Sequence, residues 1–177
     1  WESEAHKFAP TLTPKQIGSS AREEFFAEIG PGDLIITTYG LLQSESERFA
    51  SIEWNTIVLD EAQAIKNMAT KRSQTAMNLN SAFRLIMTGT PVENHLGELW
   101  NLFRFITPGL LGSLNEFKKR FAVPIERDQC RESKARLKQL IQPFLLRRTK
   151  AEVLDELPSR TEVTLLVEPT AKEAAFY

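Results

Sequence analysis

Two adjacent carboxylates are the clearest sign of chemistry in the sequence. Asp60 and Glu61 directly follow Thr56–Leu59, an apolar run typical of a buried parallel strand. In open α/β sheets, ligands bind beyond the carboxyl ends of such strands. Phosphoryl transfer needs a carboxylate that holds Mg²⁺ and a polar group that orients the attacking water; Asp60 suits the first task and Glu61 the second. The structural alternative is that both residues begin a helix, where acidic side chains are also favoured.

A second polar group, Thr88-Gly89-Thr90, follows the next apolar run, Phe83–Met87. Because the carboxyl ends of parallel strands meet at one edge of a sheet, we expect this group to lie beside the two carboxylates. Gly89 permits a backbone excursion, and the two hydroxyls can relay hydrogen bonds between a nucleotide site and a neighbouring surface. The same residues, followed by proline, also form a good turn, so the tripeptide alone is not specific.

The elements that must position these residues alternate along the chain. Apolar, β-branched runs predict strands at Asp33–Thr38, Thr56–Leu59 and Phe83–Met87. Helical patterns separate and follow them, at residues 19–29, Leu41–Ala50, Thr70–Asn80 and Leu96–Ile106. This alternation predicts an α/β fold with a parallel, doubly wound sheet whose strands are buried on both faces.

The strand signals stop after Pro108. Ser113–Phe121 and Asp128–Ile141 have helical patterns, which predicts a helical insertion on the sheet domain. A final strand-like run, Thr161–Val167, lies near the end of the chain.

The composition is that of an ordinary globular domain, with 177 residues, 42% hydrophobic and 25% charged. One cysteine, Cys130, excludes an internal disulfide framework, and two distant histidines argue against a Cys/His metal site. No run approaches the roughly 20 apolar residues of a membrane span, so we expect a soluble protein without a membrane partner. Because the chain begins at Trp1 and stops inside a helix-like run, we expect a fragment of a longer protein.

The net charge of −1 hides an asymmetry along the chain. Residues 1–100 carry 8 Lys/Arg and 13 Asp/Glu, whereas residues 101–150 carry 12 and 4, a local net charge of +8. Residues 151–177 carry 2 and 6. The basic middle segment is either a face that binds a polyanion or simply a solvated helical surface.

Taken together, the motifs resemble the Swi/Snf family of superfamily-two helicase-like ATPases, whose motors remodel chromatin or translocate on duplex DNA. The matching strings have the family's order and spacing and run nearly end to end: Trp1–Pro10, Ile35–Leu42, Leu59–Asn67, Met87–Asn94, Glu98–Phe103, Pro108–Gly112 and Pro143–Lys150.

The resemblance implies a partial RecA-like parallel sheet flanked by helices, with a helical protrusion. Residues 1–107 would be the C-terminal part of the first RecA-like lobe. Residues 108–150 would be the protrusion with a basic segment peculiar to the family, and residues 151–177 a linker or strand that leads toward the second lobe.

The resemblance also implies roles at the nucleotide. Asp60 and Glu61 would be the catalytic Walker B pair of a DEAQ box that binds Mg-ATP, with Asp60 as the metal ligand. Gln63 would belong to the same nucleotide site, where helicases of this kind more often carry histidine. Thr88, Gly89 and Thr90 would form the third motif, which couples nucleotide state to DNA contact.

Further roles implied by the resemblance concern DNA and the second lobe. The Thr37-Thr38-Tyr39 string matches a motif near the DNA backbone, with Thr37 and Thr38 as candidates for DNA binding. The basic segment contributes three cations as further candidates: Lys118, Lys119 and Arg120. Arg147 and Arg148 would take part in coupling toward the second lobe, or else form a basic helix end that faces solvent.

The sequence has no Gly followed by Lys, so it contains no phosphate-binding loop of the G-x-x-x-x-G-K-[ST] type. In the family that loop lies upstream of the part that matches Trp1, so we expect this fragment alone not to hydrolyse ATP. The complete motor would use ATP and Mg²⁺. It would act on double-stranded DNA and DNA-bound proteins, together with the rest of the motor, in the cytoplasm or nucleoid of a prokaryote or the nucleus of a eukaryote.

Two alternatives to this motor stay open at this point. The chain could be a non-catalytic scaffold of the same fold that binds DNA or protein. A metal-dependent nuclease built on Asp60 and Glu61 is disfavoured, because no further cluster of carboxylates or histidines accompanies them.

Overall fold

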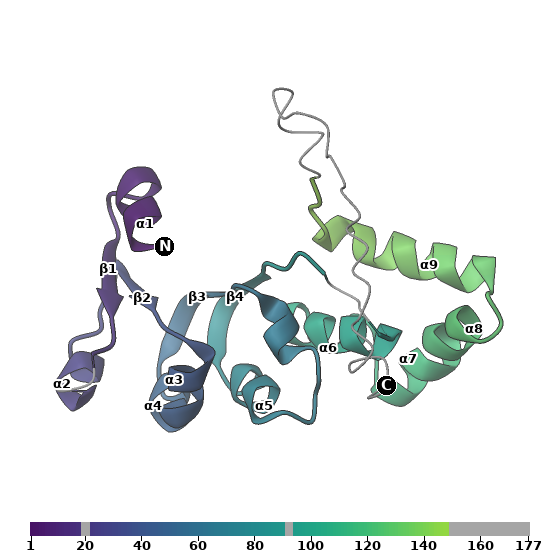
Figure 1. The fold of residues 1–177 in the computed structure, drawn as a ribbon, viewed down its shortest axis with the longest axis horizontal. Helices are drawn as coiled ribbons and strands as arrows, with labels where there is room; N and C mark the ends of the chain where they lie inside the picture. The colour runs from purple at the N-terminus through teal and green to yellow at the C-terminus, as the bar shows by residue number, and fades with distance from the viewer. Residues whose placement is uncertain (19–21, 91–93, 149–177) are drawn as a thin grey trace, which may run out of the picture. The chain divides into compact units, whose positions relative to one another are not determined.

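The computed structural model describes residues 1–18, 22–90 and 94–148 of the chain (Figure 1). The chain consists of two compact units, Trp1–Lys138 and Gln139–Tyr177. The expected strand Thr161–Val167 lies outside the described residues, as does most of the expected linker. The divisions expected at residues 107 and 150 therefore stay predictions.

Two short parallel sheets form the first unit's strand framework. Helix α1 (Glu2–Phe8), strand β1 (Thr13–Gln16), helix α2 (Arg22–Ala27) and strand β2 (Asp33–Ile36) come first. Strands β1 and β2 pair in parallel, with Thr13 opposite Asp33. Strand β1 was not predicted from the sequence, because its residues are polar and include a proline. Its side chains do contribute: Lys15 Nζ lies 2.8 Å from Asp33 Oδ2, which joins the two strands.

The second sheet is built from β3 (Glu53–Leu59) and β4 (Asn80–Ile86), paired in parallel. The helices around it are α3 (Tyr39–Ser44), α4 (Ser46–Ala50), the 3₁₀ helix η1 (Ala62–Ile65), α5 (Lys71–Met77) and α6 (Leu96–Ile106). The expected α/β architecture of parallel strands flanked by helices is thus confirmed (Figure 1). None of the helices within the described ranges is long and apolar enough to cross a membrane.

The described residues cover strands β3 and β4 on one face only, contrary to the expectation that both faces of the sheet are covered. Ile57 and Leu59 of β3 belong to the hydrophobic core, which also includes Phe105 of α6. The opposite face carries apolar side chains that remain exposed: Val58 at 45%, Phe83 at 58% and Leu85 at 42%. Successive side chains of a strand point to opposite faces, and the described residues supply a cover for one of them.

Arg84 interrupts the apolar run of β4 and has a structural task. Its guanidinium donates hydrogen bonds to the carbonyl oxygens of Phe105, near the end of α6, and of Leu79, which follows α5. It also lies over the Phe105 ring, 5.0 Å from the centroid. Burial lowers the pKa of Arg84. A cation thus joins the C-terminal ends of two helices, where the backbone carbonyls favour positive charge.

Residues 114–126, within the basic middle segment, form one continuous helical stretch that contains both α-helical and π-helical turns. It runs through α7 (Leu114–Phe117), the π-helix η2 (Lys118–Ala122) and α8 (Val123–Glu126). The helix expected over Ser113–Phe121 is observed, and its second half is a π-helix, in which Val123 N–H donates to Lys118 O. Pro124 offers no N–H to continue an α-helical pattern, which accounts for the wider turn before it.

Helix α9 spans Arg131–Ile141, and the 3₁₀ helix η3 (Gln142–Phe144) follows it. The helix begins three residues later than the expected start at Asp128, because Gln129 takes a left-handed conformation with φ of 49°.

Asn101 joins three elements beneath the sheet edge. Its side chain on α6 is fully buried, and its Nδ2 donates to Ile65 O of η1 at 2.6 Å and to Ser73 Oγ of α5 at 2.8 Å. The helix therefore fixes both the turn after β3 and the helix before β4.

Replacing this amide should destabilise the fold. We expect Asn101→Leu to lower the free energy of unfolding by about 2 kcal/mol, because it leaves buried acceptors on η1 and α5 unpaired. Asn115→Leu, at an exposed position of α7, should change it by no more than about 0.5 kcal/mol. Urea unfolding of the two variants measures the difference, and equal effects would remove Asn101 from this role.

Candidate functional site

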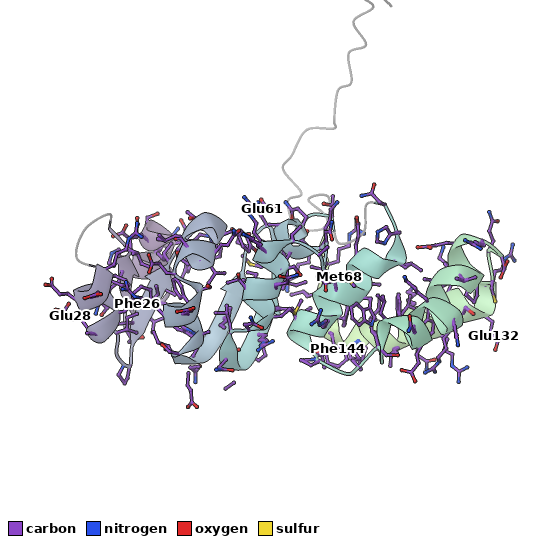
Figure 2. All side chains as sticks on the ribbon, turned by 90° about the horizontal axis from the view of Figure 1, so that it is seen from below. Phe26, Glu28, Glu61, Met68, Glu132 and Phe144 are labelled. Atoms are coloured by element: carbon purple, nitrogen blue, oxygen red, sulfur yellow. The ribbon has the colours of Figure 1, made fainter. Side chains whose placement is uncertain are left out.

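The parallel register of β3 and β4 brings the predicted polar groups to one edge. Leu59 stands opposite Ile86 at the carboxyl ends of the two strands. Beyond that pair, Met87 N–H donates to Leu59 O at 2.8 Å and Ala62 N–H donates to Met87 O at 3.0 Å. The chain after β3 is therefore tied directly to the chain after β4, as the sequence led us to expect. Glu61 lies at this end of the strands (Figure 2).

Asp60 has an exposed carboxylate with room for a further ligand. Its Oδ1 accepts a hydrogen bond from Glu61 N–H at 2.9 Å, and its Oδ2 accepts one from Trp1 Nε1 at 3.0 Å. A carboxylate has about four lone-pair positions, so lone pairs remain available. Carboxylate oxygens suit Mg²⁺, which binds through one or two carboxylates together with substrate phosphates and water.

The described ranges contain no group of three or more His, Cys, Asp or Glu side chains that could hold a metal. The same finding gives no support to a nuclease centre among these residues.

Glu61 stands at the start of η1 but does not cap it. It occupies the N-cap position, and its side chain makes no capping hydrogen bond. Its carboxylate instead accepts a hydrogen bond from Gln63 Nε2 at 2.7 Å. The alternative that Glu61 serves only to begin a helix thus has no support in the geometry.

Hydrogen bonds between side chains connect the two predicted motifs. Thr88 Oγ1 donates to Gln63 Oε1 at 3.0 Å, and Gln63 in turn donates to Glu61. Thr90 N–H donates to Thr88 Oγ1 at 3.2 Å. A displacement of the Thr88 loop would therefore alter the hydrogen bonding of the Glu61 carboxylate.

Gly89 does not have the conformation that its residue type suggested. Its φ is not positive, and a Cβ built there would meet no atom within 4 Å. The structure shows no geometric need for glycine at this position, so the expected backbone excursion is absent here.

A buried carboxylate and a half-buried ammonium group, whose roles were not predicted from the sequence, form an ion pair next to this edge. Glu98 of α6 is 4% exposed, and its carboxylate accepts hydrogen bonds from Asn94 N–H and Asn94 Nδ2. Lys66, which follows η1, lies 3.4 Å from the same carboxylate. Glu98 therefore ties the chain after the first motif to the chain after the second. An acidic residue in the first turn of an apolar helix was the available signal.

Thr37 and Thr38 lie just past the end of β2, with exposed residues at both positions. The Thr38 hydroxyl accepts a hydrogen bond from Leu41 N–H at 3.2 Å and so caps α3. The next residue, Tyr39, donates its hydroxyl to Asp60 O at 2.9 Å. This contact links the Thr37–Thr38 segment to the sheet edge.

The remaining candidates lie on other elements of the chain. Lys118, Lys119 and Arg120 are exposed on η2, where the Arg120 guanidinium lies 5.3 Å from the Phe121 ring centroid. Arg147 and Arg148 belong to the second unit. They follow η3 in irregular structure, so the expected helix end is not observed there.

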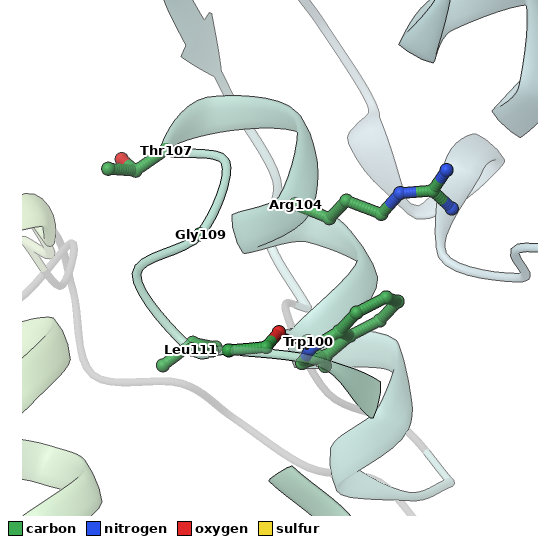
Figure 3. A pocket seen from close by; sticks show the side chains of 6 residues that line it. Trp100, Arg104, Thr107, Gly109 and Leu111 are labelled. Carbon is green, nitrogen blue, oxygen red and sulfur yellow. Dashed lines mark hydrogen bonds between the residues drawn. The ribbon is translucent and has the colours of Figure 1, made fainter. Parts of the chain in front are cut away.

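A small hollow beside α6 is part of the packing and not a nucleotide site. It is lined by Trp100, Arg104 and the returning loop Thr107–Gly112 (Figure 3). Trp100 Nε1 donates to Gly112 O at 3.1 Å, which closes the loop onto the helix. The space holds about one water molecule, far less than a nucleotide needs.

Comparison with known proteins identifies relatives over the whole chain. The family described as SNF2-related domain matches residues 1–177. YwqA of Bacillus subtilis is 41% identical over 182 residues, which cover 100% of this chain and 20% of YwqA. The chromatin-remodeling ATPase INO80 of Arabidopsis thaliana is 34% identical, over 100% of this chain and 13% of INO80.

A solved structure agrees with this relationship. The Sulfolobus solfataricus SWI2/SNF2 ATPase core in complex with dsDNA superposes with a TM-score of 0.76 at 40% identity, over 99% of this chain and 37% of that chain. The fold is therefore that of part of a RecA-like lobe of such a core. The chain spans a fifth or less of the two full-length relatives, so their complete machinery extends well beyond the segment that matches.

Proposed function

Because this chain belongs to the SNF2-related domain family, we propose that it supplies the Walker B carboxylates and the coupling motif of an ATP-dependent motor that translocates on double-stranded DNA. The observation that supports this most is the hydrogen-bond chain from Thr88 through Gln63 to Glu61 at the carboxyl edge of two parallel strands. The name of the INO80 relative describes it as an ATPase, and that of YwqA as a putative ATP-dependent helicase or translocase. DNA is present in the solved complex of the Sulfolobus core.

In this mechanism Asp60 holds Mg²⁺, either directly or through water, and Glu61 orients the attacking water and accepts its proton. When bound, Mg²⁺ would neutralise charge on the phosphates of the nucleotide. Gln63 keeps the Glu61 carboxylate in one orientation, because its amide nitrogen donates to that carboxylate while its oxygen is occupied by Thr88. A change in the position of Thr88 would thereby change the orientation of Glu61. Arg147 and Arg148 would couple the nucleotide state to the second lobe.

DNA contact is proposed for two separate surfaces of the chain. Thr37 and Thr38 would meet the DNA backbone beside α3, and the η2 cations Lys118, Lys119 and Arg120 would contact phosphates. Phosphate contacts of this kind give affinity that depends on salt and not on sequence. DNA-bound proteins would be the objects that the complete motor displaces or remodels.

We also propose that the chain alone does not hydrolyse ATP. It contains no Gly-Lys pair of a phosphate-binding loop, and backbone N–H groups of such a loop are the main cradle for a triphosphate. The carboxylate pair would then lack the partner surface against which the nucleotide is held.

Substitution of the proposed water-orienting residue tests the motor against a scaffold of the same fold. In a complete motor that contains this chain, we expect Glu61→Gln to lower kcat at least about 100-fold while the Kd for ATP changes by no more than about threefold. Glu47→Gln, at an exposed position of α4, is the matched control and should retain wild-type turnover. A variant at Glu61 with wild-type kcat would contradict the proposed role, and a wild-type protein without ATPase activity would favour the scaffold.

Neutralising the η2 cations tests the proposed DNA surface. Replacing Lys118, Lys119 and Arg120 together with Gln should reduce the slope of log K against log salt by about 2.7, because each phosphate contact contributes about 0.9. DNA-stimulated ATP turnover should weaken as well. Neutralising three exposed cations outside this segment, Lys7, Lys71 and Arg72, is the matched control. If the slope of the η2 variant is unchanged, these side chains only solvate the helix.

A further inference from the structure

The peptide group between Asp60 and Glu61 is held at both of its polar atoms. Its carbonyl oxygen, which belongs to Asp60, accepts a hydrogen bond from Tyr39 Oη at 2.9 Å. Its N–H, which belongs to Glu61, donates to Asp60 Oδ1 at 2.9 Å. The plane of this peptide sets the directions in which both carboxylates leave the backbone.

This peptide needs holding because the backbone at Glu61 is strained. Glu61 has φ of 48° and ψ of 49°, the left-handed region, which costs a residue with a Cβ about 1 kcal/mol. The Tyr39 hydroxyl is the restraint on the carbonyl side of this peptide. On the other side, the Glu61 N–H is held by Oδ1 of Asp60, whose Oδ2 also accepts a hydrogen bond from Trp1 Nε1.

Both its helix and the hydrophobic core hold the Tyr39 side chain in place. It occupies the first position of α3, directly after the Thr38 cap, and its ring packs against the buried core cluster. A shift of the Thr37–Thr38 segment would therefore move the hydroxyl that holds the Asp60–Glu61 peptide.

We propose that Tyr39 is a positioning residue that transmits contact at Thr37 and Thr38 to the strained Asp60–Glu61 peptide. The inference rests on the proposed function, since it assigns Tyr39 a part in DNA-stimulated ATP hydrolysis. Tyr39 touches neither nucleotide nor DNA in this role and acts through the orientation of Glu61. Glu61 is thus connected to its surroundings by two separate sets of contacts. One runs from β2 and α3 through Tyr39, and the other runs through Thr88 and Gln63.

Removal of one oxygen atom tests the inference. In a complete motor that contains this chain, Tyr39→Phe keeps the ring in the core and deletes the hydrogen bond to Asp60 O. We expect kcat at saturating duplex DNA to fall about threefold to tenfold, the range that one hydrogen bond spans, while KM for ATP stays within about twofold.

Trp54→Phe is the matched control. Trp54 is another half-buried ring of the same core, and its Nε1 donates to a backbone oxygen, Phe49 O, at 3.0 Å and away from the catalytic edge. This variant should lower the thermal midpoint without changing DNA-stimulated kcat. A loss of kcat in Tyr39→Phe but not in Trp54→Phe would show that kcat depends on the Tyr39 hydroxyl and not on the stability of the core in general.

Two results would overturn the inference while leaving the motor intact: a wild-type DNA-stimulated kcat in Tyr39→Phe, or an equal loss in Trp54→Phe. A wild-type motor that hydrolyses ATP without any response to duplex DNA would contradict the proposed function, and the inference would fall with it.

Discussion

The parallel pairing of β3 with β4 is the constraint on which the rest of the site depends. It places Thr88 within hydrogen-bond distance of Gln63, although the two residues are 25 positions apart in the sequence. A slip of one residue in this register would turn every side chain of β4 to the opposite face. Because Leu59 and Ile86 end their strands opposite each other, the polar residues that follow each strand must meet.

Side chains of helix α6 hold the segments next to β3 and β4 in place and so stabilise this register. Its Asn101 amide holds η1 and α5, and its Glu98 carboxylate holds Lys66 and Asn94. The Asn101 amide nitrogen and the Glu98 carboxylate are buried and hydrogen-bonded in this arrangement, and an arrangement that separated them from their partners would leave them unpaired. These contacts can therefore hold the backbone of Glu61 in its strained conformation, while the side chains of Asp60 and Glu61 stay exposed.

Local sequence patterns predicted the site better than they predicted its support. Asp60, Glu61 and Thr88 could be brought to one edge because the ends of apolar strands are visible in the sequence. The roles of Tyr39, Asn101 and Glu98 depend on partners far along the chain, which no local pattern contains. The expected helix Leu41–Ala50 is divided at Glu45, whose carboxylate is paired with Arg22 and Arg48 and whose backbone leaves the helical region.

Isothermal titration with Mg-ATP tests most directly whether this edge is one half of a nucleotide site. We expect a complete motor that contains the chain to bind Mg-ATP, and Asp60→Ala to weaken that binding. The 177-residue chain alone should show no micromolar binding. Micromolar binding by the chain alone, or binding by the motor that is indifferent to Asp60→Ala, would contradict the assignment of Asp60 and Glu61 to a Mg-ATP half-site.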